Sequence, residues 1–135
     1  MPVTLSEALC KRLDSATFVT VATIKEDGTP HLSVVWADRD GDDVLFAIMH
    51  GSHKERHLLR DPRMTVLLHP ADAPYTYASI SGTVSFTHDG KDGFMERLSL
   101  KYTGMTYAEF FPNPPENHDF VIVRLTPERV YDILE

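Results

Sequence analysis

The sequence predicts a mainly β protein, a closed or nearly closed antiparallel β-barrel with short helices outside it. Three observations support this fold class. Seven segments have the alternating or β-branched pattern of strands, helical periodicity is confined to short stretches, and turn residues separate the strands. At 135 residues we expect one domain, covering residues 1–135.

The first part of the chain is expected to hold one helix and three strands. Thr4 and Glu7 fit a capping box, which predicts a helix over residues 4–14. Segments rich in β-branched residues are the expected strands: 17–24, 30–37 and 44–49. Two turns separate them: 26–28, where Gly28 supplies a positive φ, and 38–43, centred on Asp40-Gly41. Three consecutive antiparallel strands predict a meander.

The second part alternates helices and strands. A helix is expected over 53–60, because Asp61-Pro62 cannot continue it, and another over 91–102, with a further helical turn at 106–111. The expected strands are 64–69, 75–86, 120–125 and 130–134, the last two joined through 126–128. Gly82 inside the long strand predicts a bulge or bend. Loops are expected at 70–74 and 112–118.

Composition excludes several classes of protein. The formal net charge of −7 argues against nucleic acid as a partner, because nucleic-acid domains present a broad basic face. The apolar runs fall far short of the ~20 residues that cross a bilayer, and the N-terminus lacks a signal-peptide pattern. We therefore expect a soluble, cytoplasmic protein without a membrane partner. Cys10 is the only cysteine and is expected to be a buried thiol.

The segment 51–60 carries a net positive charge, although the chain as a whole is acidic. Ser52 is a suitable N-cap for a helix that begins at His53, and Lys54 and Arg56 follow in the first turn. The helix dipole disfavours cations there, so the pattern indicates a site for an anion such as phosphate. The alternative is a solvated helix face in which Glu55 screens its neighbours.

Other chemistry finds little support in the residues. His53 and His57 have the spacing of two metal ligands, but Lys54 stands where the zinc-protease pattern requires glutamate, so no metal is expected. No serine-hydrolase elbow, Walker A loop or dinucleotide fingerprint occurs, and no catalytic residue is assigned. Trp36 and Tyr77 fall near the basic segment. They fit a flat ligand with a phosphate tail, or equally the barrel core or a dimer face.

Four segments resemble the pyridoxamine-phosphate-oxidase-like split β-barrels. They are Gly28-Thr29-Pro30-His31 with Val35-Trp36, Ser52-x-Lys54 with His57-Leu58 and Asp61-Pro62-Arg63, Tyr75-x-Tyr77 with Ile80-x-Gly82-x-Val84, and Lys101-Tyr102-Thr103-Gly104 with the closing strands. The last segment is similar to the branch that uses the deazaflavin coenzyme F420. The sequence departs from the family at Val34, usually proline, and at His57, usually asparagine.

The resemblance implies a homodimer of six- to seven-stranded split β-barrels with a cofactor at each subunit interface. Ser52 and Lys54 would hold the cofactor phosphate, Arg56 and Arg60 would meet the acidic tail of F420, and Trp36 would border the substrate pocket. The complete set of implied cofactor-binding residues is His31, Leu32, Ser33, Val34, Val35, Ile48, Met49, Ser52, Lys54, Arg56, His57, Arg60, Tyr77 and Ser79. Tyr77 and Ser79 would come from the partner subunit.

The function implied is an F420-dependent reductase. The reduced deazaflavin gives a hydride to a small activated organic substrate, and the protein supplies orientation and electrostatics. Two alternatives remain open: an FMN-dependent oxidase or reductase of the same fold, and a non-catalytic protein that binds a cofactor.

Overall fold

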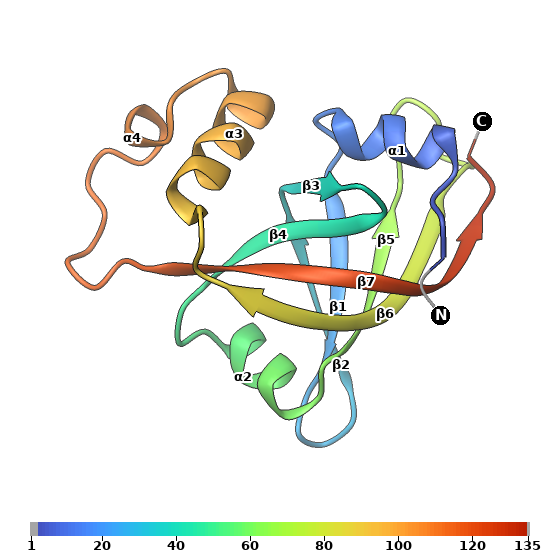
Figure 1. The fold of residues 1–135 in the computed structure, drawn as a ribbon, viewed down its shortest axis with the longest axis horizontal. Helices are drawn as coiled ribbons and strands as arrows, with labels where there is room; N and C mark the ends of the chain where they lie inside the picture. Colours follow the sequence, from blue (N-terminus) through green and yellow to red (C-terminus); the bar gives the residue numbers. More distant parts are fainter. Residues whose placement is uncertain (1–2, 135) are drawn as a thin grey trace.

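A curled, seven-stranded antiparallel sheet with short helices at its margins forms the protein, as the computed structural model shows over residues 3–134 (Figure 1). Residues 1, 2 and 135 of the expected domain lie outside the described residues. The strands are β1 Val19–Ile24, β2 Pro30–Val35, β3 Ala37–Asp40, β4 Asp43–Met49, β5 Arg63–Leu68, β6 Ala78–Thr87 and β7 Phe120–Asp132. The helices are α1 Glu7–Asp14, α2 His53–Arg60, α3 Lys91–Thr103 and α4 Tyr107–Phe110.

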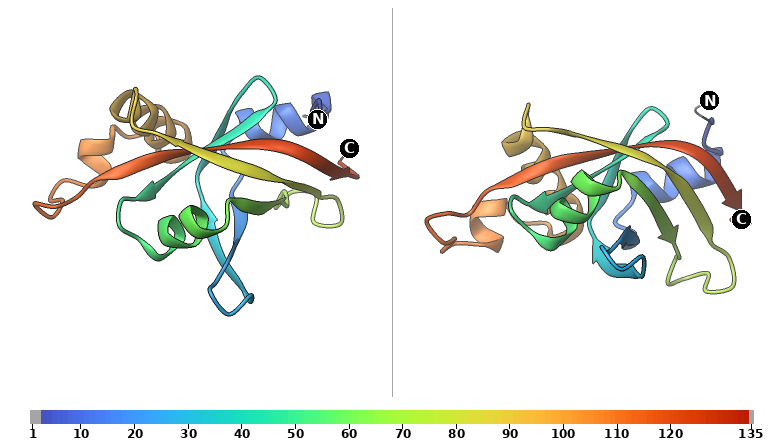
Figure 2. Two further views of the ribbon diagram at one scale, coloured as in Figure 1. Left: turned by 60° about the horizontal axis from the view of Figure 1, so that its bottom comes forward. Right: turned by 90° about the horizontal axis from the view of Figure 1, so that it is seen from below.

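The sheet has the order β2-β1-β5-β6-β7-β4-β3, and every pairing is antiparallel. The predicted fold class is therefore confirmed. β2 and β3 are the two edges of the sheet, yet Trp36 alone connects them. The sheet must therefore curl until its edges meet at Trp36, which leaves a barrel that is split at this seam (Figure 2).

The predicted meander is wrong. β1 and β2 form the expected hairpin, but β4 pairs with β3 and β7 rather than with β2. The predicted turn at 38–43 is also largely wrong, because residues 37–40 form β3 and only Gly41 and Asp42 turn the chain. The ion pair between Arg39 and Asp14, with Nε and Oδ1 2.8 Å apart, ties this short strand to the end of α1. A long-range contact therefore stabilises a strand that local pattern assigns to a turn.

The predicted N-terminal capping box is wrong by two residues. Ser6, not Thr4, is the N-cap of α1, and its hydroxyl accepts from the Leu9 N–H at 3.1 Å. Cys10, on this helix, is half-buried and packs against the core.

The two predicted closing strands are one strand, β7, that bends opposite Gly82. The register of β6 and β7 shifts between Ser81 and Gly82, which confirms the predicted bulge. A Cβ at residue 82 would lie 2.0 Å from the Thr126 carbonyl oxygen, so the close approach of the two backbones requires glycine. β6 begins only at Ala78, because residues 73–76 form a turn closed by the Thr76 N–H and the Ala73 carbonyl, 3.0 Å apart.

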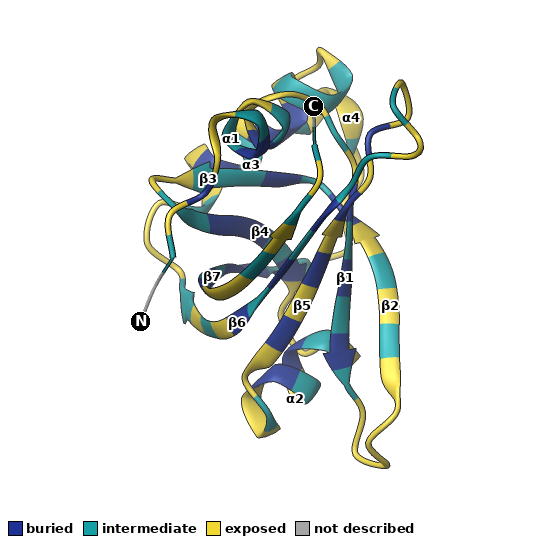
Figure 3. Ribbon diagram, turned by 90° about the vertical axis from the view of Figure 1, so that its right-hand side faces the viewer, coloured by how far each residue is buried: buried dark blue, intermediate teal, exposed yellow. Residues whose placement is uncertain are grey.

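The core fills the inside of the curled sheet. Buried residues alternate with half-buried ones along β1 and with exposed ones along β5, so one face of each strand points inward (Figure 3). A second apolar cluster lies on the outside of the sheet. In it, Phe94 and Leu98 of α3 pack against Leu45 of β4 and Ile122 of β7. This cluster fixes α3, and α4 after it, beside the seam of the barrel.

Candidate functional site

A pocket of about 330 Å³ lies at the seam, between the end of β2, the end of β4, the start of α2 and the α3–α4 segment. It brings together seven of the residues predicted to bind cofactor or substrate: Val34, Val35, Trp36, Ile48, Met49, Ser52 and Lys54. Five further residues complete its wall: Ala47, Met95, Leu98, Tyr107 and Phe110. One end of this pocket is polar and cationic, and the other is apolar and largely aromatic.

The polar end is the N-terminus of α2. Gly51, with φ +82°, turns the chain out of β4, and the Ser52 hydroxyl caps the helix as predicted, accepting from the Glu55 N–H at 3.2 Å. The Arg56 N–H bonds to the Ser52 carbonyl, as the first intrahelical bond should. The N–H groups of His53 and Lys54 precede any intrahelical acceptor and remain available to an anion.

The Lys54 side chain is half-buried beside these N–H groups. Burial lowers the pKa of its ammonium group below the ordinary value, and none of residues 3–134 supplies a carboxylate partner. Glu55, the neighbouring acid, is buried and binds the Gly51 N–H and the His50 ring instead. A partly desolvated cation without an acidic partner is stabilised by any anion that enters the pocket.

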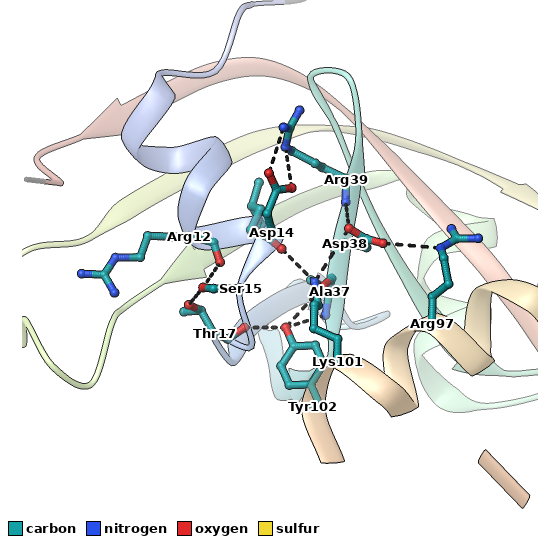
Figure 4. Close-up of polar contacts among 11 residues, drawn as sticks. Arg12, Asp14, Ser15, Thr17, Ala37, Asp38, Arg39, Arg97, Lys101 and Tyr102 are labelled. Atoms are coloured by element: carbon teal, nitrogen blue, oxygen red, sulfur yellow. Dashed lines mark hydrogen bonds and ion pairs between the residues drawn. The ribbon is translucent and has the colours of Figure 1, made fainter. Parts of the chain in front are cut away.

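Trp36 borders the pocket, and Tyr102 packs against its indole ring. The Tyr102 ring stacks on the indole, and its hydroxyl donates to the Thr17 carbonyl at 2.5 Å and accepts from the Ala37 N–H at 3.0 Å. Lys101, which precedes Tyr102 in α3, donates to the Leu13 and Ala37 carbonyls and so links α3 to α1 and β3 (Figure 4). Burial raises the pKa of Tyr102, so its hydroxyl stays protonated. The indole is thus fixed by a rigid support.

The wall opposite α2 comes from α3 and α4. Met95 and Leu98 face the pocket from α3, and Tyr107 and Phe110 from α4. The sequence predicted the helix over 91–102 that carries Met95 and Leu98, but nothing in it indicated where that helix would dock. Phe110 lies in the helical turn predicted at 106–111, and it packs against Trp36 with ring centroids 5.0 Å apart.

Three predicted basic residues lie on other faces of α2. His57 faces the hairpin, where its Nδ1 lies 3.0 Å from the Thr23 hydroxyl and its ring 5.5 Å from that of His31. Arg56 bonds to the Gly51 carbonyl and the His53 ring, and Arg60 donates to the Ile24 carbonyl. None of these contacts is with a carboxylate.

The remaining predicted residues do not line the seam pocket. Ser33 faces inward from β2 with its hydroxyl buried and unpartnered among the described residues, and Leu32 is exposed on the outer face. Ser79 lies near the start of β6, and Tyr77 just before it packs on Tyr131 with ring centroids 5.6 Å apart. A single chain therefore assembles only part of the predicted set.

The arrangement fits an elongated ligand that carries a phosphate and a planar ring. Backbone N–H groups, a hydroxyl and a lysine suit the phosphate, while Trp36, Met49 and Phe110 offer apolar surface to a ring. Within residues 3–134, no group of three or more His, Cys, Asp or Glu residues is placed to hold a metal ion. Among those residues, moreover, each helix is too short or too polar to span a membrane.

Comparison with known proteins finds solved structures of the same fold. A search of curated proteins found no match. Among solved structures, an F420 reductase superposes with a TM-score of 0.79 at 25% identity, covering 94% of this chain and 98% of its own. A conserved hypothetical protein of Mycobacterium tuberculosis gives 0.71 at 27% identity, covering 97% and 87%. An FMN-binding protein of Nostoc punctiforme, at 16% identity and TM-score 0.63 over 93% and 83% of the two chains, shares the fold.

The sequence as a whole also matches a family. Residues 5–134 match the family described as Pyridoxamine 5'-phosphate oxidase, which agrees with the motifs around Trp36, Ser52 and Gly82. The match spans nearly the entire chain, and the split antiparallel barrel with a phosphate-suited helix N-terminus at its seam is consistent with it. This chain therefore belongs to the pyridoxamine 5'-phosphate oxidase family.

Proposed function

We propose that this protein is an F420-dependent oxidoreductase, whose seam would hold a reduced deazaflavin as the hydride donor for a small unsaturated or otherwise activated organic substrate. The observation that carries the proposal is the half-buried Lys54 ammonium, without an acidic partner among residues 3–134, beside the free N–H groups of α2 and the apolar wall around Trp36. Such an arrangement suits a ring that carries a phosphate tail.

Each end of the pocket has a distinct role. Ser52, Lys54 and the first N–H groups of α2 bind the phosphate, and Val35, Ile48 and Met49 orient the ring. Trp36, Tyr107 and Phe110 exclude water from the acceptor and hold it against the ring. When bound, the cofactor supplies the hydride chemistry, so the chain needs to provide position and charge rather than a nucleophile.

Two arginines favour F420 over FMN. Arg56 and Arg60 donate to carbonyl oxygens, so their positive charges are not neutralised by those contacts. The acidic tail of F420 would meet them on the exposed side of α2, whereas FMN has no such tail. The similarity to a solved F420 reductase supports the same choice, and FMN remains the alternative cofactor.

We further propose that two copies of the chain complete the site. Val34 lines the pocket, but 64% of its surface is exposed, and it belongs to the outer face of the sheet. That face also exposes Leu32, Leu67 and Tyr131, an apolar surface that a second copy would bury. The same outer face contains a depression of about 540 Å³ between β1, β5 and the β6–β7 bulge. Tyr77 and Ser79 would then reach the cofactor of the partner.

Titration of the purified protein with F420 and, separately, with FMN tests the cofactor. Quenching of Trp36 fluorescence by F420 at micromolar concentration, with weaker quenching by FMN, is the expected result. Tight FMN binding without F420 binding would contradict the first choice of cofactor. Turnover of enones or nitro compounds with reduced F420 then tests catalysis, and tight binding without any turnover would favour a cofactor-binding protein.

A further inference from the structure

Glu55 is the buried acid of the described chain. Only 8% of its surface is exposed, and it lies in the first turn of α2, directly after Lys54. A carboxylate next to an unpaired lysine would be expected to neutralise it, which would weaken an anion site. Successive helix residues point about 100° apart, however, and the Glu55 carboxylate is turned away from Lys54.

The Glu55 carboxylate instead holds the turn that leads into the helix. Its Oε1 accepts from the Gly51 N–H at 2.8 Å, and its Oε2 lies 3.1 Å from the His50 Nδ1. The backbone N–H of Glu55 in turn donates to the Ser52 hydroxyl. A usual capping box joins the third helical residue to the N-cap, but here the Ser52 N–H is occupied by the Met49 carbonyl at 3.1 Å, and the carboxylate reaches one residue further back.

This arrangement links a buried carboxylate to Ser52 and Lys54, the two α2-end residues that line the pocket. Gly51 has φ +82°, a conformation that few residues adopt, and it stands between Met49 and Ser52, which both line the pocket. The turn therefore fixes where the Ser52 hydroxyl and the Lys54 stem leave the backbone. Burial raises the pKa of Glu55, but the bonds from Gly51 and His50 outweigh it and lower the pKa overall, so the carboxylate is ionised at neutral pH.

We propose that Glu55 is a positioning residue of the anion site: it holds the His50–Gly51 turn so that Ser52 and Lys54 are presented together to a phosphate group. It touches no ligand and acts through Lys54 and Ser52. The inference rests on the proposed function, because it concerns the same pocket. It adds that the single acid in the basic segment strengthens anion binding rather than opposing it.

A double-mutant cycle tests this role, with FMN and F420 as probes and binding measured by calorimetry. Glu55→Ala is expected to weaken binding about tenfold, since two bonds that hold the turn are lost, and Glu55→Gln, which keeps an acceptor for Gly51, by less than about threefold. In the Lys54→Ala background, Glu55→Ala should cause little further loss, because the two residues act as a unit. Glu7→Ala, which removes an exposed acid from the first turn of α1, is the matched control and should leave affinity unchanged.

Each outcome bears on the proposal. Wild-type affinity in Glu55→Ala, or an equal loss in the wild-type and Lys54→Ala backgrounds, overturns it. All titrations are run at a temperature where circular dichroism shows every variant folded, and Glu55→Met, which keeps the length of the side chain but offers Gly51 no carboxylate, serves in place of Glu55→Ala if the latter does not fold. If the wild-type protein binds neither probe, the proposed function is overturned, and this inference with it. That outcome is recognised by a flat titration of the wild-type protein.

Discussion

The Tyr102 ring lies parallel to the Trp36 indole, with centroids 5.5 Å apart and planes inclined by 8°. Trp36 is the only tryptophan of the chain, it borders the pocket, and it joins the two edges of the sheet. Its fluorescence therefore reports on the seam directly.

Replacing Tyr102 separates its ring from its hydroxyl. Tyr102→Phe removes the bonds to Thr17 and Ala37 and should cost about 1–3 kcal/mol of unfolding free energy, while the stacked ring keeps cofactor affinity within about twofold. Tyr102→Leu also removes the stack, so we expect red-shifted Trp36 emission and weaker cofactor binding. Chemical denaturation and fluorescence titration measure both. Equal cofactor affinity in the two variants would show that the stack does not position Trp36.

Lys54 should make anion binding depend on pH. Its pKa lies below 10.5 because burial disfavours the charged form, so affinity for FMN should fall as the pH rises through that lowered pKa. Lys54→Arg, which stays charged, should bind with a flat profile between pH 7 and 10. Lys54→Met should weaken FMN binding by about 10- to 100-fold, as the loss of a charged hydrogen bond does, yet slightly raise stability, by less than about 1 kcal/mol given solvent screening at a half-exposed site. A profile for the wild-type protein as flat as that of the arginine variant would exclude Lys54 from the site.

Gly82 and Gly93 allow the effect of an added Cβ to be compared at a crowded and an open position. Gly82→Ala places a Cβ 2.0 Å from the Thr126 carbonyl oxygen and should destabilise the fold by about 2–4 kcal/mol, since β7 must move away. Gly93 lies in α3 with open space around it, and Gly93→Ala should stabilise the protein by up to about 1 kcal/mol. Denaturant unfolding of both variants gives the comparison. A loss at residue 93 as large as that at residue 82 would refute the steric explanation.

His57 should make stability sensitive to acid. Burial lowers its pKa below 6.5, and the nearby charge-bearing groups, His31 and Arg60 first, lower it further. Below pH 6.5 the unfolded chain therefore binds the proton more readily than the folded one, so stability falls as the pH drops from 6.5 toward the folded pKa. His57→Asn should reduce this slope, and urea midpoints between pH 5 and 8 measure the difference. An unchanged slope would mean that His57 titrates alike in both states.

The outer face of the sheet should mediate dimer formation. Leu67→Asp places a charge among the exposed apolar residues of that face and should yield monomers in sedimentation experiments at concentrations where the wild-type protein is dimeric. Leu59→Asp, which alters an exposed leucine on α2, is the control and should remain dimeric. A wild-type protein that is monomeric at 100-fold higher concentration than the assay would rule out the proposed interface.

Features set by neighbouring residues could be predicted from the sequence. The β1–β2 hairpin follows from Gly28, the start of α2 from Ser52, and the bulge of β6 from Gly82, because each depends on the backbone freedom or hydrogen bonding of a few residues. The strand β3 could not be predicted, since its pairing with β4 and its ion pair with α1 are not local. The meander prediction was wrong for the same reason: β4 finds its second partner in β7, about 75 residues later.

The candidate site likewise contains residues that could be placed from the sequence and residues that could not. Ser52, Lys54 and Trp36 meet in one pocket, as their motifs indicated, because short connections join β2 to β4 through the seam and β4 to α2. Met95, Tyr107 and Phe110 could not be placed, since their position depends on how the apolar face of α3 packs against Leu45 and Ile122. The roles of Tyr77 and Ser79 stay a prediction, which a structure of the protein with bound cofactor would test.

The two walls of the pocket have different relationships to the sheet. The α3–α4 segment leaves β6 after Thr87 and returns at Phe120, and Thr87 pairs with Ile122 across the ladder. Its ends are therefore adjacent, so residues 88–119 form an excursion whose length and sequence leave the strand register unchanged. The pocket wall formed by α3 and α4 can therefore change without moving a strand, whereas the polar end of the pocket is built into the β4–α2 connection and cannot.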